Sequence, residues 1–306
     1  MHSTTTQEPA ADGSDGRDAT RRWPAGRPAT RWAAAAGYGR VLVIGGAEGH
    51  DDDDRILSRF VDLCGRGGAR IVVIATASAD PDKREREYID VFERLGAGTV
   101  EALRLERRDD ANSDQAVQVL RRATGVFFTG GDQVRITTVL GGSRVDTLLH
   151  NRLGDGLVLA GTSAGATMMS STMIVEGQGS RVSPASVRTA PGLGFIHGVL
   201  IDMHFAERGR LNRLLSAVAQ YPHELGLGID ENTAILVDGS QFEVIGSGAV
   251  TVIDAGPAST IDTPDDEAGA IALCDVRLHV LPAGYTFDMT GRQPRLIDTP
   301  QRGDQR

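Results

Sequence analysis

The sequence predicts an α/β protein built on a mostly parallel sheet with helices packed against it. From Arg40 onward, short apolar runs typical of buried strands alternate with amphipathic stretches typical of helices. Some of the strand-like runs end in glycine-containing turns, as at Gly45-Gly46 and at Thr129-Gly130-Gly131. Since α/β folds build their sites where such strands end, polar residues at these positions are the first candidates for function.

The first half of the chain supplies most of these elements. In the segment 52–64, apolar residues recur at helical spacing and would form one inner face, whereas 157–160 is a continuous apolar run typical of a buried strand. In chain order we expect strands at 41–44, 70–75, 100–105, 125–128 and 157–160, and helices at 52–64, 83–95, 113–122, 133–140, 143–152 and 164–169.

The second half has a different texture. A loop rich in Gly, Ser and Pro is expected over 176–194, longer than most connections and of a kind that often frames a site. A strand at 198–202 and a helix from about 210 follow. Strands at 233–237, 241–245 and 249–253 are separated by Asp238-Gly239-Ser240 and Gly246-Ser247-Gly248, which predicts a C-terminal antiparallel β meander.

The domain organisation follows from where the periodicity begins and ends. Residues 39–297 are expected to form a single domain between a disordered N-terminal tail, 1–38, and a polar C-terminal tail, 298–306. The first tail contains too little apolar side chain to offset the entropy of ordering. Arg21-Arg22 resembles a twin-arginine export signal, but the apolar stretch after it is short and interrupted upstream, so we interpret it as tail.

Composition excludes several classes of function. The formal net charge of -9 and the isoelectric point near 5.3 argue against general nucleic-acid binding. No run approaches the roughly twenty apolar residues that a membrane-spanning helix needs. The two cysteines, Cys64 and Cys274, are far apart and belong to no metal-binding pattern, which favours a reducing, cytoplasmic location.

The segment Gly161-Thr162-Ser163-Ala164-Gly165 fits the GxSxG pattern of a nucleophile elbow. A chain this rich in glycine can contain the pattern by chance, so its context decides the interpretation. An apolar strand comes directly before it and a helical start made of small residues directly after it, which is the context that the motif requires. The sequence therefore indicates a nucleophilic serine at position 163.

A serine needs a base and oxyanion donors to act as a nucleophile. Of the seven histidines, His204 follows an apolar strand and Asp202, which places it at a strand end. The backbone N–H groups of Ala164 and Gly131 are the candidate oxyanion donors, although Gly130-Gly131 could also be no more than a tight turn.

Charged residues near His204 extend the candidate site. Arg208, Arg210 and Arg213 could recognise carboxylates through their guanidinium groups, or they could simply form a solvated helix face. A carboxylate is needed to orient the base, and Asp230, Glu231 and Glu176 all remain candidates on the residues alone.

Four segments together resemble the cyanophycinase family of serine exopeptidases, which also contains aspartyl dipeptidase. They are FFTGGDQ at 127–133, GTSAGA at 161–166, IDMHFAERGRLNRLL at 201–215 and GIDENTA at 228–234. The resemblance implies a three-layer α/β sandwich that is flavodoxin-like or class I glutamine-amidotransferase-like, usually a homodimer with no metal or organic cofactor. It implies cleavage of cyanophycin, a polyaspartate carrying arginine on each side chain, into β-aspartyl-arginine dipeptides.

The resemblance also implies roles for individual residues. By motif position, Ser163 is the nucleophile, His204 the base and Glu231 the acid. Contacts to substrate are implied at Gln133, Asp202, Arg208, Arg210 and Arg213, where Asp202 would answer the arginine of the substrate and the arginines its carboxylates.

One departure from the family pattern bears on the substrate. Where the family has Asp-Gln-His, this chain has Asp202-Met203-His204, which removes one amide from the expected substrate site. Two alternatives follow: an aspartyl or isoaspartyl dipeptidase of the same family, or a homologue that binds cyanophycin without cleaving it. A glutamine amidotransferase is disfavoured because that chemistry needs a cysteine at position 163.

Overall fold

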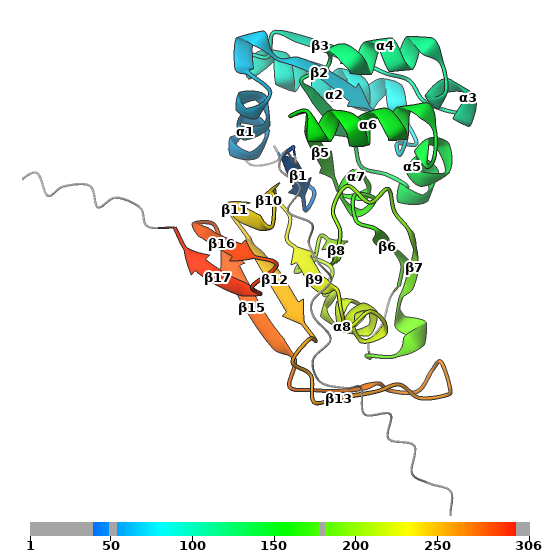
Figure 1. The fold of residues 1–306 in the computed structure, drawn as a ribbon, viewed down its shortest axis with the longest axis vertical. Helices are drawn as coiled ribbons and strands as arrows, with labels where there is room; N and C mark the ends of the chain where they lie inside the picture. Colours follow the sequence, from blue (N-terminus) through cyan, green and yellow to red (C-terminus); the bar gives the residue numbers. More distant parts are fainter. Residues whose placement is uncertain (1–38, 49–53, 178–180, 298–306) are drawn as a thin grey trace, which may run out of the picture.

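The computed structural model describes residues 39–48, 54–177 and 181–297, so both predicted tails lie outside the described residues. Within these residues, nine strands form one sheet in the order β17-β16-β11-β10-β1-β5-β4-β2-β3. Figure 1 shows the parallel strands and their helices in the upper part of the molecule, and a smaller sheet with helix α8 in the lower part.

The strands predicted from the continuous apolar runs form the parallel half of the large sheet. β1 pairs with β5, β5 with β4, β4 with β2 and β2 with β3, all in parallel. These strands are buried on both faces, except for β3, which explains why their sequences do not alternate. Their bounds are β1 Val41–Ile44, β2 Arg70–Ile74, β3 Thr99–Ala102, β4 Gly125–Phe128 and β5 Val158–Thr162.

Helices cover both faces of this half, as expected of three layers. Phe60 of α1 and Phe92 of α2 pack with Phe127 on one face, while α4, α5 and α6 pack on the other. Serine side chains cap two of these helices: Ser113 Oγ accepts the N–H of Ala116 in α4, and Ser143 Oγ accepts that of Asp146 in α6. The helices are α1 Arg55–Leu63, α2 Pro81–Arg94, α3 Arg108–Ala111, α4 Asp114–Arg122, α5 Gln133–Leu140, α6 Arg144–Gly154 and α7 Ala164–Thr167, with a 3₁₀ turn η1 at Arg66–Gly68.

The other half of the large sheet is antiparallel. β10 pairs with β1, placing Val237 opposite Val41, and β11, β16 and β17 continue the sheet outward. The turn at Asp238-Gly239-Ser240 joins β10 to β11 as predicted. These strands are β10 Thr233–Asp238, β11 Gln241–Gly246, β16 Tyr285–Asp288 and β17 Gln293–Leu296.

The third strand of the expected meander belongs to another sheet. β12 pairs with β9 and β15 instead of β11, and in the described residues the order of this sheet is β15-β12-β9-β8. Gly246 redirects the chain: its φ is +116°, which residues with a side chain rarely adopt, and a Cβ there would lie 2.1 Å from the Asn232 carbonyl oxygen. The bounds are β8 Val199–Met203, α8 Leu211–Gln220, β9 Leu225–Ile229, β12 Ala249–Asp254 and β15 Arg277–Pro282.

Three further differences from the sequence predictions concern short elements. The expected loop over 176–194 contains the 3₁₀ turn η2 (Pro184–Ser186) and β7 (Arg188–Pro191), which pairs with β6 (Thr172–Glu176). The strand expected to reach Leu105 ends at Ala102, although Leu103 and Leu105 are buried. The paired strands β13 (Thr260–Asp262) and β14 (Ala272–Cys274) were not predicted; each is only 3 residues long.

Candidate active site

Ser163 lies on a sharp turn between β5 and α7. Its φ and ψ angles are 51° and -113°, a conformation that is rare for a residue with a side chain. Both glycines of the motif are required by close packing of backbone. A Cβ on Gly161 would lie 2.3 Å from the Gly165 carbonyl oxygen, and one on Gly165 would lie 2.4 Å from that of Phe128. The turn is thereby fixed and the hydroxyl projects from it.

His204 follows β8 and contacts the serine. Its Nε2 lies 2.9 Å from Ser163 Oγ, and its Nδ1 lies 2.6 Å from Glu231 Oε1. The backbone N–H of His204 donates to the Gly45 carbonyl at 3.0 Å, which ties the second sheet to the end of β1. The imidazole is only 13% exposed. Three side chains that are far apart in the sequence thus form one hydrogen-bonded chain, in the order serine, histidine, carboxylate.

Of the three candidate carboxylates, the structure places Glu231 against the imidazole. Asp230 accepts the backbone N–H groups of Ala206 and Ala249, each at 3.1 Å, and therefore holds the turn itself. Burial raises the pKa of Asp230. Glu176 pairs with Arg188 at 2.7 Å on an exposed surface of the β6–β7 hairpin.

The loop after β1 forms one wall of the imidazole site, which the sequence reasoning missed. Gly46 has a φ of +108°, and a Cβ there would lie 2.2 Å from His204 Cε1. Gly45 is equally confined, because a Cβ would lie 1.9 Å from the Asp230 carbonyl oxygen. The glycine pair at the end of the first strand was visible in the sequence, but it was interpreted only as a turn.

The Gly130-Gly131 turn lies beside the serine. A Cβ on Gly130 would lie 3.3 Å from Ser163 Cβ, and Gly131 has a φ of +142° with Ala77 packed against it. Within the part of the chain that the structure describes, the backbone N–H groups of Gly131 and Ala164 donate to no other group. This leaves both available to a ligand at Ser163.

Asp202 and Arg213 form a buried ion pair beneath the site. The side chain of Asp202 is fully buried, Arg213 Nε donates to its Oδ2 at 2.9 Å, and Arg213 Nη2 and Arg210 Nη1 bond its Oδ1. Arg213 also donates to the Gly177 carbonyl at 3.2 Å. Both oxygens of Asp202, which the sequence analysis expects to contact substrate, are thus bonded to arginines from the turn and helix that follow it.

The other residues expected to contact substrate differ in exposure and in the hydrogen bonds that they already make. Arg208 is exposed, whereas Arg210 is partly buried and donates to the Met203 carbonyl. Burial lowers the pKa of Arg210 to about 10, so it remains a cation at neutral pH. Gln133 begins α5, and its Nε2 donates to the carbonyls of Ile174 and Val175 at 2.9 and 3.0 Å, which leaves its carbonyl oxygen as the group to meet a ligand.

Met203 points into the core and not toward a ligand. It is 2% exposed and packs in the main apolar cluster with neighbours from β8 and β9. The Met203 thioether packs against apolar neighbours around β8, whereas a glutamine amide there would be a polar group within an apolar cluster. The departure from the family pattern thus changes the core under the site.

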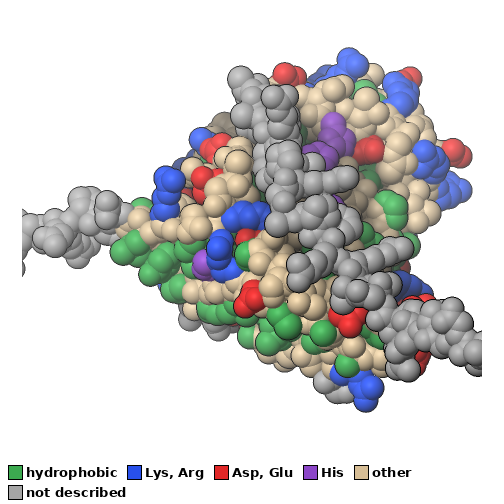
Figure 2. Space-filling view, turned by 60° about the horizontal axis from the view of Figure 1, so that its bottom comes forward, with side chains coloured by type: hydrophobic (Ala, Val, Ile, Leu, Met, Phe, Trp, Pro, Cys, Tyr) green, Lys and Arg blue, Asp and Glu red, His purple; other side chains and the backbone are tan. Residues whose placement is uncertain are grey.

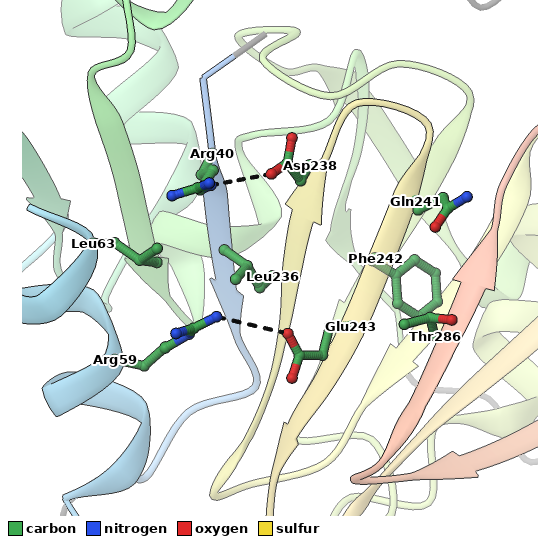
Figure 3. A pocket seen from close by; sticks show the side chains of 9 residues that line it. All are labelled: Arg40, Arg59, Leu63, Leu236, Asp238, Gln241, Phe242, Glu243 and Thr286. Carbon is green, nitrogen blue, oxygen red and sulfur yellow. Dashed lines mark hydrogen bonds and ion pairs between the residues drawn. The ribbon is translucent and has the colours of Figure 1, made fainter. Parts of the chain in front are cut away.

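A hollow of about 520 Å³ lies elsewhere, between α1 and the antiparallel strands β10 and β11 (Figure 3). Two ion pairs cross it, Arg40 with Asp238 at 3.0 Å and Arg59 with Glu243 at 3.9 Å. Ser163, His204 and Glu231 are not among the residues that line it. Among the described residues, no group of three or more His, Cys, Asp and Glu side chains is arranged to hold a metal ion.

The chain is similar to known proteins in sequence and in fold. The sequence model of peptidase family S51 matches residues 41–245. A cyanophycinase from Nostoc sp. (strain PCC 7120 / SAG 25.82 / UTEX 2576) is 40% identical over 258 residues, which are 82% of this chain and 86% of that protein. A cyanophycinase from Thermosynechococcus vestitus (strain NIES-2133 / IAM M-273 / BP-1) is 37% identical over 261 residues, 83% of this chain and 80% of that protein. The crystal structure of a peptidase from an acI-B1 Actinobacterium matches with a TM-score of 0.59 at 22% identity, covering 83% of this chain and 98% of that one, which shows a shared fold.

Proposed function

The chain belongs to peptidase family S51, and from that membership we propose that it hydrolyses cyanophycin to β-aspartyl-arginine dipeptides through an acyl-serine intermediate. The observation that carries the proposal is the continuous contact from Ser163 Oγ through the His204 ring to Glu231, at 2.9 and 2.6 Å. Relatives that are 37% to 40% identical over most of the chain are cyanophycinases, which supports cyanophycin as the substrate.

In the first step, Ser163 Oγ attacks a carbonyl carbon of the polymer while its proton moves to His204 Nε2. The positively charged imidazole is held by Glu231, and the backbone N–H groups of Gly131 and Ala164 stabilise the negative carbonyl oxygen. When the tetrahedral intermediate collapses, the proton on Nε2 passes to the leaving amine and the carbonyl stays bound to Ser163 as an ester. The turn that holds Ser163 is in this account a nucleophile elbow.

In the second step, a water molecule gives a proton to His204 and attacks the ester carbonyl. The intermediate collapses, Ser163 recovers its proton from Nε2, and the dipeptide leaves with a carboxylate end. Every step uses a group of the chain or water, so the mechanism requires no cofactor.

Charge complementarity supports the assignment of the substrate. Arg208 and Arg210 follow His204 within six residues and would bind the carboxylates of the polymer. Gln133, just after the Gly130-Gly131 turn, would contact the polymer through its side-chain carbonyl. Asp202 and Arg213 would act from below by fixing the position of Arg210. The dipeptidase and binding-only alternatives depended on Met203, and its burial in the core leaves neither with a supporting observation.

Purified protein is expected to clear a suspension of insoluble cyanophycin and release β-aspartyl-arginine, whereas Ser163→Ala does neither. Chromatography of the supernatant measures the dipeptide. Cleavage of short isoaspartyl peptides without solubilisation of the polymer would select the dipeptidase, and co-sedimentation of an inactive wild type with the polymer would select the binding protein.

We also propose a homodimer and a cytoplasmic location. Among the described residues, no helix is both long and apolar enough to cross a membrane. Cys274 is an exposed free thiol, which suits a reducing compartment. Cell fractionation tests the proposed location.

A further inference from the structure

Glu48 places a carboxylate directly behind the candidate catalytic pair. It lies in the loop after β1, and its two oxygens accept short hydrogen bonds from two different elements. Thr162 Oγ1 donates to Oε2 at 2.5 Å, and the Tyr88 hydroxyl of α2 donates to Oε1 at 2.5 Å. Thr162 is the residue immediately before Ser163, so the Glu48 carboxylate is hydrogen-bonded to the neighbour of the serine.

The same loop also holds the histidine. The Gly45 carbonyl accepts the backbone N–H of His204, and Gly46 packs against the imidazole ring. The backbone N–H of Ser163 in turn donates to the Ile44 carbonyl at 3.1 Å. The end of β1 and the loop after it therefore contact both partners of the Ser163–His204 pair: Ile44 bonds Ser163, and Gly45 and Gly46 contact His204. A displacement of this loop would change the distance between the two side chains.

We propose that Glu48 is a positioning residue of this site, which holds Thr162 and hence Ser163 in place and supplies a negative charge that favours the positively charged imidazole formed during the reaction. The proposal rests on the proposed serine chemistry and does not depend on which peptide is the substrate. Glu231 orients the imidazole by direct contact. Glu48 acts from the side of α2, through Thr162 and through space.

Burial and hydrogen bonding act on the pKa of Glu48 in opposite directions. Burial raises the pKa of Glu48, while the hydroxyls of Thr162 and Tyr88, its own backbone N–H and the attraction of His204 lower it. The groups that face it are Thr162 of β5, His204 after β8, and Tyr88 of α2, whose own pKa is raised by burial and by Glu48 and is also affected by Arg84 and Glu87. As pH falls through the raised pKa of Glu48, the carboxylate gains a proton and loses its attraction for the imidazole.

The test is the rate at which a fluorophosphonate probe labels Ser163, which reads the serine and histidine without any peptide substrate. Glu48→Gln is expected to label about 10 to 100 times more slowly than wild type at neutral and alkaline pH, because displaced reacting groups commonly cost such factors. Since Gln resembles the protonated carboxyl, the two rates should converge as pH falls. With cyanophycin, kcat should fall while KM stays within about twofold.

Glu224→Gln is the matched control. Glu224 is also a buried carboxylate, 6% exposed, and it accepts a hydrogen bond from a threonine, Thr172, at 3.2 Å. It precedes β9 and so lies at the opposite end of that strand from Glu231. Its replacement should leave the labelling rate unchanged. Circular dichroism and a thermal melt establish that each variant is folded.

Equal labelling of Glu48→Gln and wild type, a rate ratio that does not change with pH, or an equal loss in Glu224→Gln would overturn the proposal. If Glu48→Gln does not fold, Thr162→Val and Tyr88→Phe each remove one hydrogen bond and should each slow labelling. Normal labelling in both would overturn it as well. Failure of the proposed function is distinguishable, because wild type would then be labelled without clearing cyanophycin, or would not be labelled at all.

Discussion

Gly46 shows how closely the main chain confines the imidazole of His204. Its φ of +108° is one that residues with a side chain rarely adopt, and the place where a Cβ would lie is 2.2 Å from His204 Cε1. The ring is held by backbone on this side and by Glu231 on the other. A rigid wall of this kind keeps Nε2 directed at Ser163 without a further side chain.

Gly46→Ala is therefore expected to lower kcat/KM by about 100-fold or more, because the added methyl group must displace the imidazole. Gly65→Ala is the matched control. Gly65 has a similar φ of +102°, but its nearest neighbours would lie 3.9 Å from a Cβ, and it is remote from the site. Steady-state kinetics and thermal melts of both variants separate displacement of His204 from backbone strain. Near-normal activity of a folded Gly46→Ala would contradict this view of the wall.

At this scale, the sequence indicated the members of the Ser163–His204–Glu231 contact but not the residues that surround it. Ser163 and His204 were identified by strand ends and by the GxSxG motif, and Glu231 by resemblance alone. Gly46 and Glu48 were missed because their partners, His204 and Thr162, are more than a hundred residues away in the sequence. Asp202 was assigned to substrate by resemblance, and its bonds with Arg210 and Arg213 were missed because they depend on how the turn after β8 folds back.

The element that joins the site to the second sheet is the strand, turn and helix from β8 to α8. Asp202 near the end of β8 bonds Arg213 on α8 and Arg210 just before it, so one buried carboxylate pairs with two cations. His204 lies between these residues in the sequence. The ion pairs thereby fix the turn from which the imidazole and Arg208 project.

Asp202→Asn is expected to lower the free energy of unfolding by about 3 to 5 kcal/mol, because it leaves buried guanidinium groups without a counter-charge. Asp238→Asn breaks the Arg40–Asp238 pair, which is about half exposed on both sides, and should cost less than about 1 kcal/mol. Urea denaturation of the two variants and wild type measures both values. Two equal, small losses would show that the buried pair does not stabilise the turn.

Element types were predicted well in the parallel half and less well in the antiparallel part. Continuous apolar runs such as 41–44 identify strands that are buried on both faces, and their connecting helices follow from helical spacing. β12 was assigned to the wrong partners because a run such as 249–253 shows that a strand exists but does not show which sheet it joins. β13 and β14 are only 3 residues each, too short for a strand pattern to be recognised in the sequence.

At the scale of the whole molecule, the site lies where the two sheets meet. Ser163 comes from the end of a parallel strand of the large sheet, and His204 and Glu231 come from the ends of β8 and β9 in the small one. The site therefore depends on the packing of the two sheets against each other. The backbone bonds from His204 to Gly45 and from Asn232 to Gly46 cross this boundary.

Exposed apolar side chains on the edge strands of both sheets suit the proposed homodimer. Leu278 and Val280 are 49% and 58% exposed on the edge strand β15, and Leu296 of β17 is 64% exposed. Figure 2 shows hydrophobic side chains gathered along the lower left of the molecule, near the end of β17. Edge strands with exposed apolar side chains are suited to pairing with another chain.

Val280→Asp is expected to shift the protein from dimer to monomer in analytical ultracentrifugation, because it places a charge within this apolar surface. Val134→Asp, which changes an exposed valine on α5, should leave the dimer intact. A wild type that sediments as a monomer, or a Val280→Asp variant that remains a dimer, would remove β15 from the interface.

The central claim is that Ser163 is the nucleophile and that His204 activates it where cyanophycin binds. The most direct measurement is the mapping by mass spectrometry of the residue that a fluorophosphonate probe labels, with and without soluble cyanophycin. The account predicts that the label is on Ser163, that His204→Ala slows labelling by at least about 100-fold, and that the polymer protects the serine. A label on another residue, or labelling of Ser163 that neither His204→Ala nor cyanophycin slows, would contradict it.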